Sequence, residues 1–313
     1  MTTKQAGAVT VSGITVELSN SGKTLFPDDQ ITKGDLVGYY RDIAARMLRY
    51  LRDRPLSMER YPDGITGERI VQKNVPRYFP GWVTRTRVKK QGGTLVQVIC
   101  DKPATLVYLA NQACIEMHAF LSRTGALDRA DQLIFDLDPP DDNRFDVVKH
   151  LALGLRELLE DELGLTAFVK TTGGRGLHVH VPLNARDDFD TVRRFARQAS
   201  DVLAAREPDS LTTEQRKDSR GDRVYADVMR NAYAQTAVAP YSVRARPGAP
   251  VATPLHWAEL DDPGLTPHQF TLRTVGARLD RLGASDPWAG LGRRRYGLAR
   301  ATQRLAKLAA GAG

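Results

Sequence analysis

Two aspartates after an apolar run are the residues in this sequence best suited to chemistry. Asp136 and Asp138 follow residues 133–135, and Pro139 and Pro140 come next. Side chains alternate faces along a strand, so both carboxylates point the same way, and the prolines end the strand. Such a pair repels unless a cation lies between the carboxylates, and Mg²⁺ or Mn²⁺ is the usual occupant. An ordinary strand running into a turn is the alternative.

A third acid and two arginines extend this chemistry. Asp227 lies among apolar residues in a predicted strand over 224–229, where an unpaired carboxylate is costly and needs a partner. Three carboxylates could hold two metal ions for phosphoryl or nucleotidyl transfer. Arg244 and Arg246 share a face of a strand predicted over 241–246, and they could grip a triphosphate.

A glycine-rich segment lies between two predicted strands, over residues 166–172 and 177–182. Gly174, Arg175 and their glycine neighbours follow Thr172, without the Lys-Ser/Thr ending of a Walker loop. Glycines of this kind can bring backbone N–H groups close to a phosphate, although a plain hairpin turn fits equally well. His178 shares a strand face with His180, a pair that is more often structural than metal-binding.

Near the N-terminus, the sequence predicts a helix that starts at Thr32, with Asp35 three residues later as in a capping box. Lys33 would then lie in the first turn, where open N–H groups attract anions. With Asn20 and Lys23 on the preceding loop, it could form a phosphate pocket. A solvated lysine at a helix start is the simpler alternative.

The composition favours a polyanionic partner. The 313 residues carry a formal net charge of +8 with a pI of about 9.5. A basic hairpin tip over 84–93 includes Arg85, Arg87 and Lys89, for which nucleic-acid contact and solubility remain equal alternatives. Cys100 and Cys114 give no zinc or disulfide pattern. Without a long apolar run or a signal peptide, we expect a cytosolic protein.

The periodicity predicts helices and strands in mixed order and hence a mixed α/β fold. We expect a disordered lead over 1–8, a main domain over 9–285 and a basic, partly helical tail over 286–313. The main domain would divide into a smaller N-terminal module, about 9–100, and a catalytic module, about 101–285. The predicted elements include a hairpin over 9–16, a strand over 115–118 and helices over 103–112, 145–163, 187–206 and 270–282.

Four longer stretches carry a specific resemblance. They are Phe135-Asp-Leu-Asp-Pro139, Thr172-Gly-Gly-Arg-Gly-Leu-His178, Ala226-Asp-Val-Met-Arg-Asn231 and residues 236–251. From Leu18 to about Arg281, the chain resembles the primase-polymerase domain of bacterial ligase D, in the archaeo-eukaryotic primase superfamily. The resemblance implies a catalytic sheet flanked by helices and a two-metal nucleotidyltransferase, with Mn²⁺ or Mg²⁺, that extends DNA at gaps or breaks. It also implies a preference for ribonucleotides and a location at the bacterial nucleoid.

The resemblance also assigns roles to residues. The metal ligands would be Asp136, Asp138 and Asp227. The incoming nucleotide would be bound by His118, Thr172, Gly174, Arg175, His178, Arg220, Arg244 and Arg246. The DNA 5′-phosphate would be bound by Asn20, Lys23 and Lys33, and further DNA contacts would come from Ile70, Val71, Arg85, Arg87 and Lys89.

Three departures from the family pattern stand out. Ile70 and Val71 replace a pair of phenylalanines that stacks on a base beside the break, and Thr172 stands where many members have Ser. No ligase or nuclease motif is fused, so the chain resembles stand-alone primase-polymerases that work with a separate DNA ligase. Two other functions remain open: a non-catalytic DNA-end binder, or another two-metal enzyme such as a nuclease.

Overall fold

The computed structural model describes residues 7–311, which form two compact units, each assembled from several chain segments. The first unit contains the chain up to Gly125 together with 236–252 and 270–281, and the second contains 126–235, 253–269 and the chain from Leu282 on. The first break therefore comes later than the expected boundary near residue 100. The expected lead over 1–8 lies outside the described residues except for its last two, because a strand begins at Gly7.

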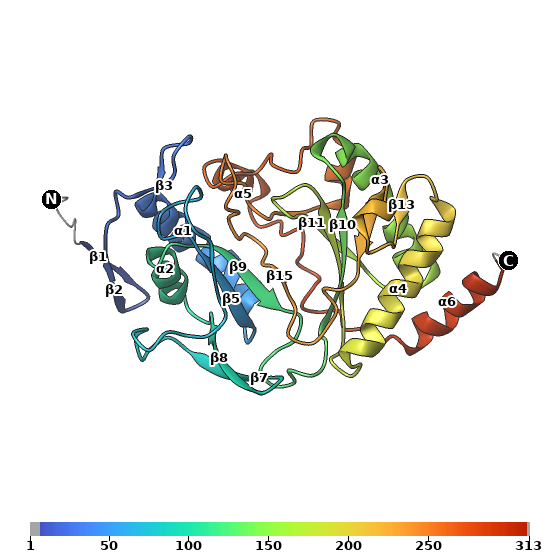
Figure 1. Cartoon of the computed structure of the whole chain (residues 1–313), viewed down its shortest axis with the longest axis horizontal. Coiled ribbons are helices and arrows are strands. Elements are labelled where there is room, and N and C mark those ends of the chain that lie inside the picture. Colours follow the sequence, from blue (N-terminus) through green and yellow to red (C-terminus); the bar gives the residue numbers. More distant parts are fainter. Residues whose placement is uncertain (1–6, 312–313) are drawn as a thin grey trace. The chain divides into compact units, whose positions relative to one another are not determined.

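The first unit is built on an antiparallel sheet with the order β15-β9-β5-β8-β7, and β6 pairs with β5. Two short ribbons, β1–β2 and β3–β4, precede it, and α1 packs against α2 (Figure 1). The strands are β1 (Gly7–Val11), β2 (Ile14–Leu18), β3 (Thr24–Phe26), β4 (Ile31–Thr32), β5 (Pro55–Arg60), β6 (Ile70–Gln72), β7 (Arg85–Lys90), β8 (Gly93–Ile99), β9 (Cys114–Phe120) and β15 (Thr236–Val238). The helices are α1 (Lys33–Leu51), α2 (Pro103–Asn111) and α5 (Val275–Leu282).

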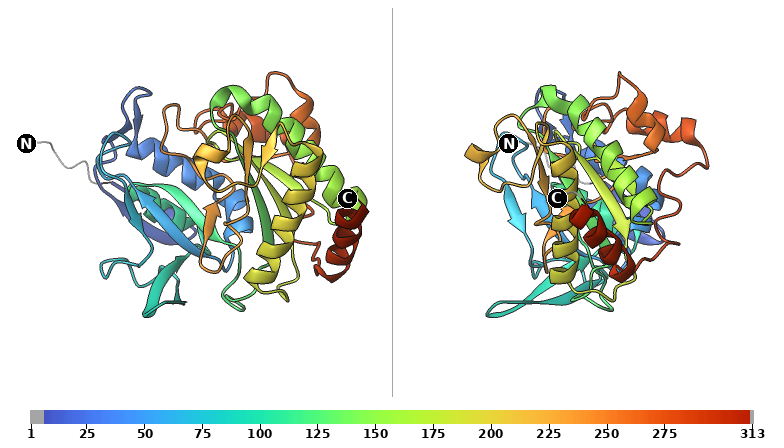
Figure 2. Two further views of the ribbon diagram at one scale, coloured as in Figure 1. Left: turned by 45° about the vertical axis from the view of Figure 1, so that its right-hand side comes forward. Right: turned by 90° about the vertical axis from the view of Figure 1, so that its right-hand side faces the viewer.

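The second unit is built on a six-stranded sheet with the order β13-β14-β10-β12-β11-β16. All its pairs are antiparallel except β13–β14, and α3 and α4 both pack on β10 (Figure 2). The strands are β10 (Gln132–Asp138), β11 (Phe168–Thr171), β12 (Leu177–Pro182), β13 (Leu211–Thr212), β14 (Val224–Asp227) and β16 (Pro254–Leu255). The helices are α3 (Phe145–Glu157), which continues as a π-turn over Leu158–Glu162, α4 (Phe189–Arg206) and α6 (Ala299–Gly311); short 3₁₀ turns are Asp142–Arg144, Lys217–Ser219 and Trp257–Asp261.

The predicted mixed α/β fold is confirmed, and most predicted elements are present. The start of α1 has the predicted capping box: Thr32 Oγ1 accepts from the Asp35 amide, and the Asp35 carboxylate accepts from the Thr32 amide. The predicted strand over 241–246 is wrong, because only Val243 forms an isolated bridge there. Tyr241 has a positive φ of 66°, which turns the chain out of an extended path.

Candidate active site and nucleic-acid contacts

The three aspartates lie on two neighbouring strands of the second unit. Asp136 and Asp138 alternate on β10, and Asp227 ends β14 directly opposite Asp136 in the antiparallel register. Cross-strand partners point to the same face of a sheet, so the predicted grouping of the three carboxylates follows from the pairing. Asp227 also accepts a hydrogen bond from the Met229 amide at 2.8 Å, which holds its carboxylate at the strand end.

Arg230 is a partner of these acids that the sequence did not reveal. Its Nε lies 3.3 Å from the Asp136 carboxylate and 4.0 Å from that of Asp227, so one guanidinium bridges both strands. It follows Asp227 by three residues, in a turn whose conformation the residue types do not predict. Asn231 anchors that turn, because its side chain exchanges hydrogen bonds with the backbone of Ile134 on β10.

His178 lies opposite Asp136 on the other neighbour of β10, strand β12. Its Nε2 lies 3.3 Å from the Asp136 carboxylate. Burial and the nearby charge of Lys170 lower the pKa of His178 to about 4, so the ring is neutral at pH 7. Within the described part of the chain, its buried Nδ1 has no hydrogen-bond partner, which leaves one ring nitrogen for a bound molecule.

The carboxylates differ in their electrostatic balance. Burial would raise the pKa of Asp136, but the hydrogen bond from His178 and the charges of Arg230 and Lys170 hold it well below its usual range. Burial raises the pKa of Asp138, and the adjacent Asp136 raises it further. Burial likewise raises the pKa of Asp227, again with a contribution from Asp136. Asp138 and Asp227 thus sit where a positive charge would favour their ionised forms.

The glycine loop brings Arg175 to this strand end. A Cβ on Gly176 would collide with the carbonyl oxygen of Leu137, so only glycine permits the loop to lie so close to β10. The Thr172 hydroxyl accepts from the Gly174 amide at 3.1 Å and donates to the Gly176 carbonyl at 3.1 Å. Thr172 therefore shapes the loop, and the predicted phosphate-facing amide of Gly174 already has an acceptor.

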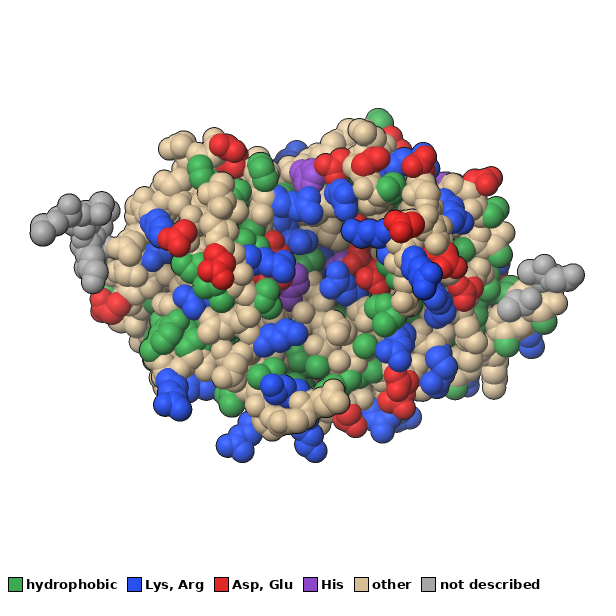
Figure 3. Space-filling view, viewed as in Figure 1, with side chains coloured by type: hydrophobic (Ala, Val, Ile, Leu, Met, Phe, Trp, Pro, Cys, Tyr) green, Lys and Arg blue, Asp and Glu red, His purple; other side chains and the backbone are tan. Residues whose placement is uncertain are grey.

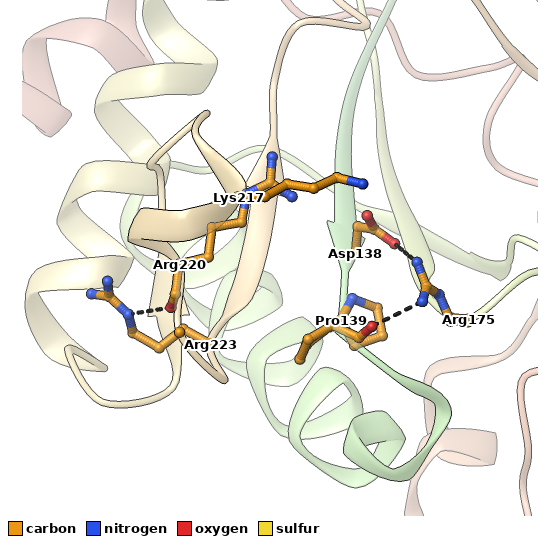
Figure 4. Close-up of a pocket in the computed structure, with 8 residues that line it drawn as sticks. Asp138, Pro139, Arg175, Lys217, Arg220 and Arg223 are labelled. Atoms are coloured by element: carbon orange, nitrogen blue, oxygen red, sulfur yellow. Dashed lines mark hydrogen bonds and ion pairs between the residues drawn. The ribbon is translucent and has the colours of Figure 1, made fainter.

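A pocket of about 220 Å³ opens beside Asp138. In Figure 4, Arg175 and Lys217 extend toward Asp138 from opposite sides. Arg220 stacks on the ring of Tyr225, 3.7 Å from its centroid, and Tyr225 is the cross-strand partner of Asp138. The lining residues are Asp138, Pro139, Pro140, Arg175, Lys217, Arg220, Gly221 and Arg223. Four cations and one acid make this pocket suited to an anionic ligand.

In the first unit, the predicted nucleotide-binding residues His118 and Arg244 meet at one carboxylate, that of Glu116. His118 Nε2 lies 3.0 Å from it and Arg244 Nε 2.8 Å. Arg246 is exposed, and its guanidinium has no hydrogen bond or ion pair with any described residue. Because the 241–246 segment is irregular, the two arginines do not share a strand face as predicted.

The first unit also contains a group that could hold a metal ion. One ligand atom each from Glu59, Glu116 and His118 lies within 4.8 Å of the others. Within residues 7–311 no other group of three His, Cys, Asp or Glu ligand atoms is that close, so the three aspartates of the second unit are spread more widely. The Glu59 group was not predicted from the sequence.

The predicted 5′-phosphate residues Asn20, Lys23 and Lys33 lie together, but the start of α1 does not offer open amides as expected. The first three amides of α1 are already used: Lys33 N donates to Lys23 O, Gly34 N to Ser21 O and Asp35 N to Thr32 Oγ1. The expected open helix end is therefore wrong, and any anion would depend on side chains and not on these amides.

The two lysine side chains have different surroundings. Lys33 Nζ is buried and donates to Ser19 Oγ and Asn111 O, and burial, with the nearby charge of Lys23, lowers its pKa. Lys23 is exposed and pairs with Asp63 at 2.6 Å. Asn20 is also exposed and has a positive φ of 51°.

The predicted DNA-contacting residues are exposed on β6 and β7. Ile70 and Val71 are 38% and 45% exposed, unusually high for large apolar side chains. Arg85, Arg87 and Lys89 alternate on one face of β7. The guanidinium of Arg85 folds back onto the carbonyls of Phe79 and Pro80. Figure 3 shows many Lys and Arg side chains exposed on the surface.

A family model described as the primase-polymerase domain of LigD matches residues 32–288. The chain belongs to this family. It is 37% identical over 286 residues to the multifunctional non-homologous end joining protein LigD of Pseudomonas aeruginosa, covering 91% of this chain and 34% of that protein. It is 30% identical over 269 residues to the bifunctional LigD of Bacillus subtilis, covering 86% and 43%. The chain thus spans less than half of the curated relatives it matches.

A solved structure of the same family agrees with the fold. The polymerase domain from Mycobacterium tuberculosis ligase D in complex with DNA is 31% identical, with a TM-score of 0.83, and the match covers 90% of this chain and 99% of that one. The resemblance inferred from the sequence motifs is therefore confirmed. Among the described residues, no helix is long and apolar enough to span a membrane.

Proposed function

We propose that this chain is a DNA-repair primase-polymerase that adds nucleotides, preferably ribonucleotides, to a primer strand paired with a template at gaps or breaks bearing a 5′-phosphate. The observation that carries the proposal is the register of β10 and β14, which sets Asp227 opposite Asp136 with Asp138 two residues away. Membership in the primase-polymerase family supports it, as does the likeness to a polymerase domain that was solved with DNA.

The face of the second sheet that carries Asp136, Asp138 and Asp227, the acidic face, fits hard divalent cations. Carboxylate oxygens are the ligands that Mg²⁺ and Mn²⁺ prefer, and burial near a like charge raises the pKa of Asp138 and Asp227, as expected where a cation compensates the charge. Asp136, Asp138 and Asp227 would hold two ions of this kind. When bound, such ions activate an attacking hydroxyl and neutralise charge on the phosphates.

The chain's own side chains would bind and orient the nucleotide. Arg175, Lys217 and Arg220 line the pocket beside Asp138 and would neutralise phosphate oxygens there. Arg220 is held in place by its stacking on Tyr225 and by hydrogen bonds from its guanidinium to the carbonyls of Glu214 and Gln215. The unpartnered Nδ1 of His178 would accept a hydrogen bond from the substrate.

Other residues would bind DNA and the remaining part of the nucleotide. The exposed guanidinium of Arg246, with Arg244 and His118, would contact the sugar or triphosphate. Lys23 and Lys33 would bind a terminal 5′-phosphate, since two neighbouring cations favour a group with nearly two charges over a diester with one. The exposed residues of β6 and β7 would contact the duplex. A DNA ligase would seal the product.

An extension assay tests the proposal. The substrate is a gapped duplex with a 5′-phosphate and a labelled primer, incubated with NTPs or dNTPs and with Mn²⁺ or Mg²⁺. We expect template-directed primer extension, faster with NTPs. Shortened primers would indicate a nuclease, and binding without any change in primer length would indicate an end-binding protein; either outcome would overturn the proposal.

A further inference from the structure

Glu116 is a buried carboxylate that receives three hydrogen-bond donors. Its side chain is 6% exposed. Its Oε2 accepts from Arg244 Nε at 2.8 Å and lies 3.0 Å from His118 Nε2. Its Oε1 accepts from the amide of Ala245 at 2.9 Å. One carboxylate therefore connects β9 to the loop that follows β15.

The geometry follows from the strand. Glu116 and His118 are two residues apart on β9, so their side chains share one face. Burial would raise the pKa of Glu116, but the hydrogen bond with His118 and the charge of Arg244 lower it to about 2. The group is therefore ionised at neutral pH, and its bonds to charged donors are of the stronger kind.

The neighbouring Glu59 adds a second carboxylate to this group, and an arginine lies beside each of the two. Glu59 is the cross-strand partner of Glu116, and its Oε1 lies 3.4 Å from His118 Nε2. Its other oxygen lies 3.4 Å from Arg69, and Arg244 is paired with Glu116. Two guanidinium groups thus match two carboxylates, and a cation at Glu116 Oε2 would have to compete with Arg244.

Glu116 is one of the anchors of the loop that carries Arg244. Residues 241–246 form no strand, and Tyr241 holds a positive φ of 66°. The bonds that fix the segment to β9 include Met117 N to Ser242 Oγ at 2.8 Å and the two bonds from Arg244 and Ala245 to Glu116. Pairing through Nε also fixes the plane of the Arg244 guanidinium, and hence the direction of its terminal nitrogens.

We propose that Glu116 is a positioning residue, which sets His118 and Arg244 in the orientation that receives the incoming nucleotide. The inference rests on the proposed function, because it assigns the two positioned side chains to the nucleotide. A site whose side chains are already oriented does not have to order them on binding, which favours affinity. Removing the charge of Glu116 would therefore weaken nucleotide use without touching the aspartates of β10 and β14.

The test is Glu116→Gln, which keeps the shape and removes the charge. We expect the apparent KM for the nucleotide to rise about tenfold or more, with a smaller change in kcat and unchanged affinity for gapped DNA. Glu17→Gln is the matched control, because Glu17 is an exposed carboxylate on β2 whose side chain has no ion pair or hydrogen bond in the described chain. A wild-type KM in Glu116→Gln would overturn the inference.

Double-mutant cycles separate positioning from a general effect on folding. Adding Glu116→Gln to Arg244→Ala should raise KM by a smaller factor than it does in the wild type, because one of the two side chains that the carboxylate positions is already absent. Adding Glu116→Gln to Arg246→Ala should raise KM by the same factor as in the wild type, because Arg246 has no contact with Glu116. Full additivity with Arg244→Ala would contradict the inference.

A second cycle covers the case in which Glu116→Gln does not fold. The effects of His118→Ala and Arg244→Ala on KM should then be less than additive, because losing either side chain loosens the carboxylate that positions the other. Strict additivity would overturn the inference.

The proposed function and the positioning role can be refuted separately. A wild-type protein that adds no nucleotide refutes the proposed function, whereas an active wild-type protein with an unaffected Glu116→Gln variant refutes only the positioning role.

Discussion

Asp136 and Asp227 face each other across the antiparallel pair β10–β14, and the guanidinium of Arg230 bridges them. Two neighbouring carboxylates are stabilised by positive charge, and Arg230 contributes it to both. The arrangement links the stability of the acidic face to cations in the buffer.

Replacing Arg230 should expose that dependence. In EDTA, we expect Arg230→Ala to lose about 1 kcal/mol of unfolding free energy, a modest value because the arginine is 42% exposed. Saturating Mn²⁺ should recover more stability in Arg230→Ala than in the wild type. Urea denaturation with and without Mn²⁺ measures both the stability lost on substitution and the stability recovered with the ion. Equal stability of the two proteins in EDTA would contradict the bridging role.

The 5′-phosphate site can be tested from both sides of one ion pair. Lys23 is held by Asp63, which competes with any phosphate. Lys23→Ala should reduce the preference for a 5′-phosphate over a 5′-hydroxyl by about 1 kcal/mol, roughly fivefold. Asp63→Asn should increase that preference. Binding of the two DNA ends by fluorescence anisotropy checks this, and a shift of both variants in the same direction would refute it.

The basic hairpin offers a matched pair of arginines. Arg85 is bonded to the carbonyls of Phe79 and Pro80, whereas Arg87 is exposed and has no partner among the described residues. Arg87→Ala should lower the slope of log K against log salt by about one, the effect of one lost phosphate contact. Arg85→Ala should change the slope less. Identical slopes for Arg87→Ala and the wild type would remove β7 from the DNA interface.

Glu116 predicts a pH dependence of stability. Its pKa is lowered to about 2 in the folded chain, against about 4.3 for a free glutamate. The stabilisation is therefore fully present above about 4.3 and is lost as pH falls toward 2, by an amount on the order of 3 kcal/mol. His118, Glu59 and Arg244 face the same carboxylate.

The comparison of wild type with Glu116→Gln isolates this contribution. Their difference in unfolding free energy should narrow as the pH falls below 4. Denaturant titrations at each pH measure it, and a difference that is independent of pH down to 2.5 would show that the carboxylate is not ionised in the folded state.

Strand periodicity was enough to place Asp136 and Asp138 on one face, and the cost of a buried carboxylate correctly indicated that Asp227 needs partners. Arg230 was missed because its approach depends on the turn after β14, which residue types do not determine. The same reasoning that was applied to Asp227 would have drawn attention to Glu116, an acid between apolar residues of a strand, two positions before His118.

Two local predictions failed for reasons outside local sequence. The 241–246 segment alternates like a strand, but the positive φ of Tyr241 and the anchors to Glu116 give it another path. The start of α1 was predicted correctly at Thr32, yet its amides are taken by carbonyls of Ser21 and Lys23, a contact set by tertiary folding. Periodicity predicts elements, whereas the partners of loops depend on the whole fold.

The most direct measurement is single-turnover extension of a gapped, 5′-phosphorylated duplex by Asp138→Ala and by the wild type, with DNA affinity measured in parallel. We expect the wild type to add a templated nucleotide, and Asp138→Ala to add none above background while its DNA affinity stays within about twofold, because basic side chains supply most of the binding. Measurable extension by Asp138→Ala would contradict the assignment of the acidic face as the site of nucleotidyl transfer.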